Sequence, residues 1–429
     1  MKKLLALVLC IAMMLPVVSA LAASEYDVTE PITIVWWHAH EDQLTEYLNY
    51  MVDKFNAENE FGITVKPQYI GSYSEINSQF ISANSAGTVP ALVTCNTSYP
   101  AAYGAAHLCE ILDPYIEEYD YDIEDFGEGL MASTQYDGEQ VALPYLISTQ
   151  VMYYNKTMAD AEGIVMPKTL DDMEEFLKKA TLFNEDGTTK RYGTVFGGWD
   201  YWYYETLYKN NGVETVTADG KTDINSEKSV EITAKIKEWI DAGYAYYAYG
   251  DGASTNMRQL FIDGGAFSVF HTSSLYDTYV NRVGDNFEVG MAWLPGSSDG
   301  TSFKSEVGGA AIMIPAKASQ AEKNAAWQFL MFMTSPEINL YWADKTGYFP
   351  TKASVQATEE YAEYLERKPA MKDIVAMAEW INPRNQNPAY DACANLWRHA
   401  LARIFNEDAP IQETLDQLAV EIQEQLDGK

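Results

Sequence analysis

Residues 31–70 read PITIVWWHAHEDQLTEYLNYMVDKFNAENEFGITVKPQYI, and this stretch decides the fold class. Its first seven residues form an almost unbroken apolar run, which predicts a buried strand over 31–37. Apolar side chains three and four positions apart follow, which predicts a helix with one buried face. Gly62 then opens a second strand over 63–70. The buried face of the helix consists of Leu44, Tyr47, Leu48, Met51, Val52 and Phe55.

The same alternation continues along the chain. A helix over 74–86 and a third strand over 90–95 complete an order of strand, helix, strand, helix and strand, which is typical of an α/β lobe with a largely parallel sheet. Ligands bind such lobes beyond the carboxyl ends of the strands. Because His38, Tyr73 and Thr97 occupy those ends, we expect them at a binding edge.

The rest of the chain predicts a second lobe of the same class. Strands over 151–155 and 266–270 are expected in this lobe, and strands over 287–294 and 310–315 after the chain returns to the first lobe, with helices between and after them. A single core does not extend over 429 residues. The sequence therefore predicts an α/β fold of two lobes, each a mixed sheet flanked by helices, with a cleft at the hinge. We place lobe 1 at residues 23–145 plus 272–342 and lobe 2 at residues 146–271 plus 343–429.

The charge balance excludes two classes of partner. The chain has 62 Asp and Glu against 29 Lys and Arg, a formal net charge of −33. Nucleic-acid backbones and anionic membrane surfaces both attract basic faces, so neither is an expected partner. Since 47% of the residues are hydrophobic, a folded protein is expected rather than a disordered one.

The first residues predict export. Lys2 and Lys3 precede an apolar run over 4–18, and small residues over 19–23 follow, which is the pattern of a signal peptide over residues 1–22. The run is too short for a transmembrane helix. Lipid anchoring through Cys10 is the alternative, and the large Leu9 before that cysteine disfavours it. We expect a soluble, periplasmic or extracytoplasmic protein.

Three cysteines, Cys95, Cys109 and Cys393, follow the predicted signal peptide. An oxidising compartment permits a Cys95–Cys109 bridge with Cys393 free, whereas three buried thiols are the other interpretation. The sequence leaves both open. No Cys-x-x-Cys motif is present, so a thiol redox function has no support.

The candidate enzyme motifs are weak. His38-Ala-His40 begins like a hydrolase metal motif, but the histidine expected next is Gln43. Residues 296–300 match Gly-x-Ser-x-Gly, yet a strand follows instead of the helix that a nucleophile elbow requires. No spacing singles out an acid/base pair among the carboxylates. A secreted glycan hydrolase remains the alternative from another class.

An aromatic string carries the functional signal. Residues 197–208 read GGWDYWYYETLY, in which Trp199 and Trp202 are three positions apart after two glycines. Aromatic rings exposed in a cleft stack on the C–H surfaces of sugars and polyols. We expect Trp199 and Trp202 in the cleft, and Tyr203, Tyr204 and Tyr208 in the core.

The chain resembles the family 1 extracellular solute-binding proteins of ABC importers, and most closely their glycerol-3-phosphate-binding branch. The resemblance implies a non-enzymatic, monomeric, two-lobed clamp of the type II periplasmic-binding-protein fold, without a cofactor or metal, recognised by importer membrane subunits when closed. The strings that carry it are Trp37-His38, Phe55-Asn-Ala-Glu-Asn59, Gly71-Ser-Tyr73, Val151-Met-Tyr-Tyr-Asn-Lys156, Gly198-Trp-Asp-Tyr-Trp202, Gly308-Gly-Ala310 and Lys345-Thr-Gly-Tyr-Phe-Pro350.

The resemblance also implies a ligand and its contacts. A small polar ligand is expected, either glycerol 3-phosphate or a related glycerophosphodiester, with Arg384 meeting the phosphate. Thr97 stands where that branch has a glutamate, and a threonine cannot replace a carboxylate that accepts two hydroxyls. A sugar or oligosaccharide ligand therefore stays open. The implied contacts are Tyr73, Ser148, Trp199, Trp202, Thr272 or Ser273, Gly309, Tyr348 and Arg384.

Overall fold

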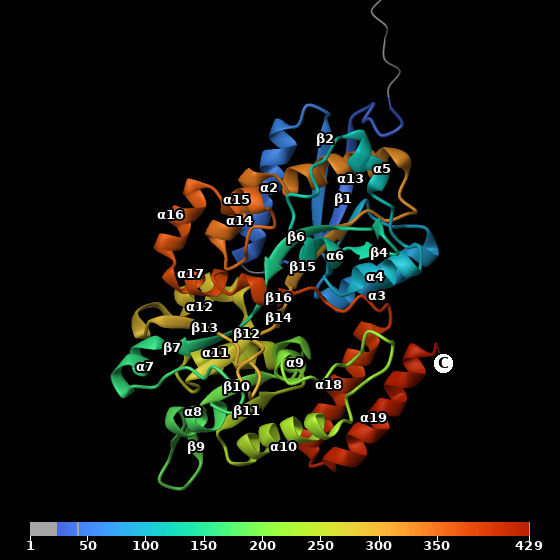
Figure 1. Ribbon diagram of the computed structural model, residues 1–429. Coiled ribbons are helices and arrows are strands. Elements are labelled where there is room, and N and C mark those ends of the chain that lie inside the picture. Colours follow the sequence, from blue (N-terminus) through green and yellow to red (C-terminus); the bar gives the residue numbers. More distant parts are fainter. Residues whose placement is uncertain (1–23, 41–42, 429) are drawn as a thin grey trace, which may run out of the picture.

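The computed structural model describes residues 24–40 and 43–428, which form two α/β lobes one above the other (Figure 1). The predicted signal peptide, residues 1–22, lies outside the described residues. Within the described ranges, no helix is both long enough and apolar enough to cross a membrane.

Residues 31–70 fold as predicted. Its strands are β1 (Ile32–His38) and β2 (Ile63–Tyr69), paired in parallel, with helix α2 (Gln43–Glu58) between them. They belong to a five-stranded sheet in the order β2-β1-β3-β15-β6. Strand β15 is antiparallel to both of its neighbours, so the sheet is mixed. The other three strands are β3 (Leu92–Asn96), β15 (Gly308–Met313) and β6 (Leu143–Ser148).

Helices cover both faces of this first sheet. Trp36 and Phe329 lie in the core on the face that α2 and α13 (Gln320–Met333) cover, whereas Phe80 and Tyr103 lie in the core on the face covered by α3 (Tyr73–Ala86) and α4 (Tyr99–Ala105). The remaining elements of lobe 1 are α5 (Asp113–Glu118), α6 (Glu128–Ala132), the hairpin of β4 (Gln135–Tyr136) and β5 (Glu139–Gln140), α14 (Pro336–Lys345) and α15 (Ala353–Gln356).

The second lobe is built on a three-stranded antiparallel sheet in the order β12-β7-β13. Two core clusters pack on it, one beneath α9 and α18 and the other beneath α11 and α17. Its strands are β7 (Gln150–Asn155), β8 (Leu182–Phe183), β9 (Thr189–Arg191), β10 (Thr194–Gly197), β11 (Ala245–Ala248), β12 (Ser268–Thr272) and β13 (Val289–Trp293). Its helices are α7 (Lys156–Glu162), α8 (Met173–Ala180), α9 (Trp202–Lys209), α10 (Glu227–Asp241), α11 (Ala253–Ile262), α12 (Tyr276–Val283), α16 (Glu359–Arg367), α17 (Pro369–Val375), α18 (Tyr390–Glu407) and α19 (Ile411–Leu426), with short 3₁₀ turns at Ser273–Leu275, Gly284–Asn286 and Ala378–Trp380.

The chain crosses between the lobes at a hinge that hydrogen bonds hold together. Thr149 alone separates β6 from β7, and its Oγ1 lies 2.6 Å from the Oγ of Ser305 in β14 (Ser305–Glu306). Strand β14 pairs in parallel with β16 (Ile381–Asn382). The side-chain Oε1 of Gln150 accepts the backbone N–H of Glu306 at 2.9 Å. Three separate chain segments therefore meet at the hinge between the lobes.

Strand pairing corrects the lobe boundaries that we predicted from the sequence. We expected the chain to return to lobe 1 at residue 272, but β13 pairs with β7, so the return comes only after Trp293. Strand β6 pairs with β15 of the first sheet, so lobe 1 extends to Ser148 rather than to residue 145. Ser354 hydrogen-bonds Asp125 of lobe 1, so α15 also stays with lobe 1. Hydrophobic patterns identify strands but do not say which sheet a strand joins.

Candidate ligand-binding cleft

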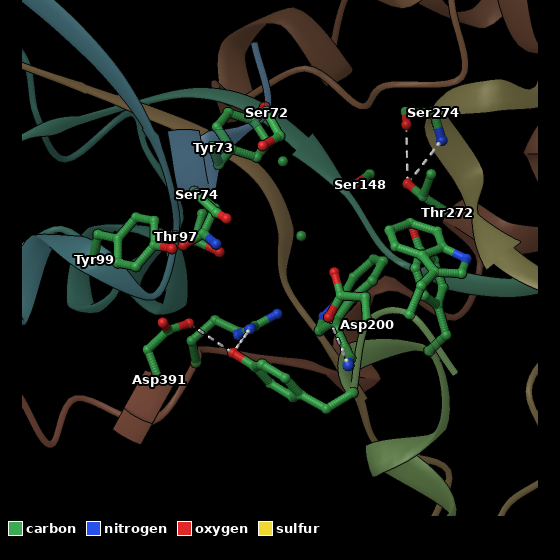
Figure 2. A pocket seen from close by; sticks show the side chains of 18 of the residues that line it. Ser72, Tyr73, Ser74, Thr97, Tyr99, Ser148, Asp200, Thr272, Ser274 and Asp391 are labelled. Carbon is green, nitrogen blue, oxygen red and sulfur yellow. Dashed lines mark hydrogen bonds between the residues drawn. The ribbon is translucent and has the colours of Figure 1, made fainter. Parts of the chain in front are cut away.

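A cavity of about 410 Å³ lies between the lobes and takes side chains from both. Figure 2 shows Ser72, Tyr73 and Thr97 of lobe 1 on one side of it, and Asp200 and Thr272 of lobe 2 on the other. The cavity lies at the carboxyl ends of β3 and β6, and ligands of α/β lobes bind at such strand ends. Its lining residues are Ser72, Tyr73, Ser74, Asn96, Thr97, Tyr99, Ser148, Trp199, Asp200, Tyr201, Trp202, Tyr203, Thr272, Ser274, Gly308, Gly309, Tyr348, Arg384, Asp391, Asn395 and Arg398.

A capping box positions the first aromatic residue of the cleft. Ser72 Oγ accepts the backbone N–H of Glu75, and the Glu75 carboxylate accepts the N–H of Ser72, so helix α3 begins at Tyr73. Burial raises the pKa of Tyr73 well above its ordinary value, and burial also raises the pKa of Tyr348. Both phenols therefore stay protonated near pH 7 and can donate to a ligand.

The ends of β3 and β6, together with the glycines at the start of β15, form one wall of the cleft. Thr97 Oγ1 donates to the Val307 carbonyl at 3.3 Å, and Ser148 ends β6 beside β15. Gly309 in β15 has φ 105, and a Cβ there would lie 2.0 Å from the Leu146 carbonyl oxygen. Only glycine fits this position, which brings backbone to the wall of the cleft.

Two tryptophans form the aromatic wall. Trp199 lies in the turn before α9, and Trp202 is the first residue of that helix. Glycines make room for both rings, because a Cβ on Gly308 would lie 2.4 Å from the Trp202 ring and a Cβ on Gly197 would lie 3.3 Å from Trp199 Nε1. Within the described part of the chain, neither indole N–H has a hydrogen-bond partner. Both indole N–H groups are therefore buried donors.

Arg384 is the buried cation of the cleft and is only 6% exposed. One Nη donates to the hydroxyl of Tyr201 at 2.8 Å. The guanidinium also lies over the rings of Tyr201, Trp202 and Tyr390, with carbon-to-centroid distances of 5.4, 5.9 and 5.9 Å. Such an aromatic cage holds the planar fork in place while leaving donors for a ligand.

A buried ion cluster lies directly behind Arg384. Its Nε is 3.9 Å from Glu306 Oε2, Glu306 also pairs with Lys209, and Lys209 Nζ lies 3.5 Å from Glu205 Oε1. Burial and the nearby Glu306 raise the pKa of Glu205 to about 7. Burial opposes ionisation of Glu306, but Lys209 and Arg384 nevertheless lower its pKa. Two cations and two carboxyl groups thus hold each other in a dry site.

Two carboxylates line the cleft that the sequence analysis did not single out. Asp200 accepts the backbone N–H of Trp202 at 3.0 Å, and burial raises the pKa of Asp200. Asp391 Oδ1 accepts the Tyr201 hydroxyl at 3.2 Å and lies 3.2 Å from Ser98 Oγ. Asp200 lies inside the aromatic string that we did single out. Asp391 could have been identified from its helical spacing to Asn395 and Arg398, which places all three on one face of α18.

The structure brings most of the predicted contacts together, but not all of them. His38 is buried below the cleft, where its Nδ1 accepts the N–H of His40 and its ring lies 5.4 Å from that of Trp36. Ser273 Oγ instead accepts the N–H of Thr149, so these two contacts were misplaced. A strand end fixes the position of a backbone but not the direction of its side chain. The predicted residues that line the cavity are Tyr73, Thr97, Ser148, Trp199, Trp202, Thr272, Gly309, Tyr348 and Arg384.

The other sequence motifs have structural roles. Cys95, Cys109 and Cys393 are buried free thiols, so the structure holds no Cys95–Cys109 bridge. Ser297 Oγ donates to Asp299 in a turn that no helix follows, so Ser298 is not on a nucleophile elbow. Across residues 24–40 and 43–428, no three His, Cys, Asp or Glu side chains form a group that could hold a metal.

Comparison with known proteins finds one family. The family described as bacterial extracellular solute-binding protein matches residues 50–371. Among curated proteins, the chain is similar to the sn-glycerol-3-phosphate-binding periplasmic protein UgpB of Escherichia coli O1:K1, with 25% identity over 368 residues, 82% of this chain and 80% of that protein.

Solved structures share the fold. The chain matches UgpB from Mycobacterium tuberculosis in complex with glycerophosphocholine at a TM-score of 0.82, with 20% identity and coverage of 93% of this chain and 99% of that one. It matches the GacH receptor of Streptomyces glaucescens, solved unliganded and with acarbose, at a TM-score of 0.79, with 20% identity and the same coverage. The two-lobed α/β architecture predicted from the sequence is therefore confirmed.

Proposed function

This chain belongs to the bacterial extracellular solute-binding proteins, and on that premise we propose that it binds glycerol 3-phosphate or a glycerophosphodiester for an ABC importer. The observation that carries the proposal is Arg384, a buried guanidinium in an aromatic cage on the wall of the interlobe cavity. A guanidinium donates two parallel hydrogen bonds to a phosphate. Trp199 and Trp202 then stack on the carbon skeleton that carries the phosphate.

The cleft also compensates for the missing glutamate at Thr97. Asp200 and Asp391 line the same cavity from lobe 2, and a carboxylate accepts charge-assisted hydrogen bonds from two hydroxyls. The acceptors for the glycerol hydroxyls therefore come from lobe 2. This arrangement supports a polyol phosphate in spite of the departure from the family pattern.

A sugar or oligosaccharide is the second candidate, and the charge of the cleft favours it. Two carboxylates, Asp200 and Asp391, offset the two guanidinium groups, Arg384 and Arg398, along the cavity wall. A neutral ligand with many hydroxyls pairs with such a balanced set without leaving a charge unmatched. Paired indoles and scattered hydroxyls suit a sugar ring as well as a glycerol unit.

Binding closes the clamp by a population shift. Tyr73 and Thr97 belong to lobe 1, whereas Trp199 and Arg384 belong to lobe 2, so a ligand that touches all four has its full contacts only when the lobes are together. The closed form is then the one that the importer's membrane subunits receive. Turnover is no part of this role, in contrast to the glycan hydrolase alternative.

Calorimetric titration of purified protein tests the proposal with glycerol 3-phosphate, glycerophosphocholine, glucose and maltose. We expect micromolar or tighter binding of a phosphate ligand, which corresponds to about 8 kcal/mol. Arg384→Ala should abolish phosphate binding and weaken sugar binding only partly, while Arg403→Ala, an exposed arginine of α18, serves as the control. If no phosphate or sugar binds, or if a chromogenic glycoside is hydrolysed, the proposal is wrong.

A further inference from the structure

Helix α18 presents a row of polar side chains to the cleft beyond Arg384. Asp391, Asn395 and Arg398 all line the cavity, and their spacing of four and three residues places them on one face of the helix. Seven residues of helix extend about 10 Å. Figure 2 shows Asp391 on the Thr97 and Tyr99 side of the pocket, away from Thr272 and Ser274.

This row begins next to the proposed phosphate position. The Tyr201 hydroxyl accepts from Arg384 at 2.8 Å and lies 3.2 Å from Asp391, so one side chain links the two. Asn395 Nδ2 lies 2.9 Å from the Asp391 carbonyl and 3.3 Å from its Oδ2. Arg398 lies two turns away from Asp391 on the same face of the helix.

Arg398 is a second cation of the cleft, and its charge favours ionisation of Asp200. Among the described residues Arg398 has no carboxylate within ion-pair distance; one Nη lies 3.0 Å from His399 Nε2, and the guanidinium lies 6.0 Å from the centre of the Tyr249 ring. Burial and the neighbouring Arg398 lower the pKa of His399, so the ring is a neutral acceptor at pH 7. Donors of Arg398 remain for a ligand.

We propose that Asp391, Asn395 and Arg398 form an outer subsite, which binds a second polyhydroxyl unit joined to the group held by Arg384. The inference rests on the proposed function and names its ligand class: a glycerophosphodiester with a polyol head group, or an oligosaccharide. A carboxylate, an amide and a guanidinium offer acceptors and donors side by side, as neighbouring hydroxyls require. A quaternary ammonium head group has no hydroxyl or N–H, so it cannot form hydrogen bonds with the amide or the guanidinium.

The size of the cavity supports a ligand longer than glycerol phosphate. At about 410 Å³ the cleft falls in the range of about 300–1,000 Å³ that holds drug-sized ligands. The lining of the cavity includes both Arg384 and Arg398, so the space continues along α18 past the proposed phosphate position. The polar side chains of the outer subsite line this remaining space.

Paired ligands of matched chemistry test the subsite by calorimetric titration. Glycerophosphoinositol and glycerophosphocholine are both diesters and differ in the head group, while maltose and glucose differ by one sugar unit. We expect the polyol or longer member of a pair to bind about tenfold more tightly or better. Arg398→Ala and Asn395→Ala should each reduce that ratio to threefold or less, whereas Arg403→Ala on the exposed face of α18 should preserve it.

Each result decides one proposal or both. Equal affinities within both pairs, tighter binding of glycerophosphocholine, or a ratio unchanged in both α18 variants would overturn the outer subsite while leaving the proposed function intact. Absence of binding for all four ligands would overturn the proposed function and the subsite together. The melting temperature of each variant shows whether weaker binding comes from a missing contact with the ligand or from an unfolded protein.

Discussion

Ser98, just after strand β3 of lobe 1, lies with its Oγ 3.2 Å from Oδ1 of Asp391 in helix α18 of lobe 2. The same hydroxyl lies 2.6 Å from Asn96 Oδ1, so its single proton is shared between the two lobes. Residues 293 positions apart in sequence thereby close the cleft from one side. The contact belongs to the closed form, since separation of the lobes breaks it.

Loss of this contact should favour the open form. Ser98→Ala removes one hydrogen bond to a charged group, and we expect the ligand identified by titration to bind roughly fivefold more weakly, about 1 kcal/mol. Ser85→Ala, which removes an exposed hydroxyl of α3, should leave the affinity unchanged. Small-angle scattering should show a larger unliganded Ser98→Ala protein. Equal affinity of wild type and Ser98→Ala would show that the contact contributes nothing to closure.

Gly308 should be required for the aromatic wall. Because a Cβ at this position lies 2.4 Å from the Trp202 ring, Gly308→Ala forces the indole to move. We expect affinity to fall at least about tenfold with an altered tryptophan emission spectrum, since stacking depends on ring position. A matched control is Gly127→Ala, where a Cβ meets nothing within 4 Å. Retained affinity and spectrum in Gly308→Ala would remove Trp202 from the binding wall.

Acid should destabilise the protein through His40. Burial, with a smaller effect of His38, lowers the pKa of His40 from 6.5 to about 3. The unfolded chain therefore binds more protons than the folded chain below pH 6.5, and stability falls as the pH falls towards 3. His40→Phe keeps a ring against Tyr145 and Trp342 and removes the titration.

Urea unfolding at pH 7 and pH 4.5 measures this effect. We expect the stability lost between these pH values to be smaller by about 2 kcal/mol in His40→Phe than in the wild type. His107→Asn is the control, because His107 is exposed and its left-handed backbone suits asparagine. Identical losses in wild type and His40→Phe would contradict the assignment.

The ion cluster behind Arg384 should be sensitive to the loss of one cation. Burial by itself lowers the pKa of Lys209, but Glu205 and Glu306 raise it, so the lysine is charged in the fold. Lys209→Met leaves two buried carboxyl groups with only Arg384 nearby, and we expect a loss of about 3–5 kcal/mol at pH 8. The loss should be smaller at pH 5, where the carboxyl groups take up protons.

A second variant makes this test specific. Lys209→Met with Glu306→Gln removes one charge of each sign, so the double variant should regain part of the stability that Lys209→Met loses. Thermal unfolding of the single and double variants at pH 8 and pH 5 measures how much stability is regained. A loss that is independent of pH and unrelieved by Glu306→Gln would indicate lost packing rather than lost charge.

The helices and strands, and the aromatic character of the cleft, could be predicted from residue type and spacing. Apolar periodicity located β1, α2 and β2, because hydrophobic spacing is a local property of the chain. The glycine-flanked aromatic string placed Trp199 and Trp202, and the resemblance placed Arg384; all three line the cavity. Residue type and spacing were sufficient for these.

Which strands share a sheet and which side chains share a site depends on contacts between distant segments of the folded chain. Strand β13 joined lobe 2 rather than lobe 1, and His38 turned into the core instead of the cleft. Asp391 came within reach of Ser98, and Glu306 within reach of Arg384, through contacts far apart in sequence. A cleft between two lobes depends on how distant segments meet at the hinge, and no local pattern encodes that meeting.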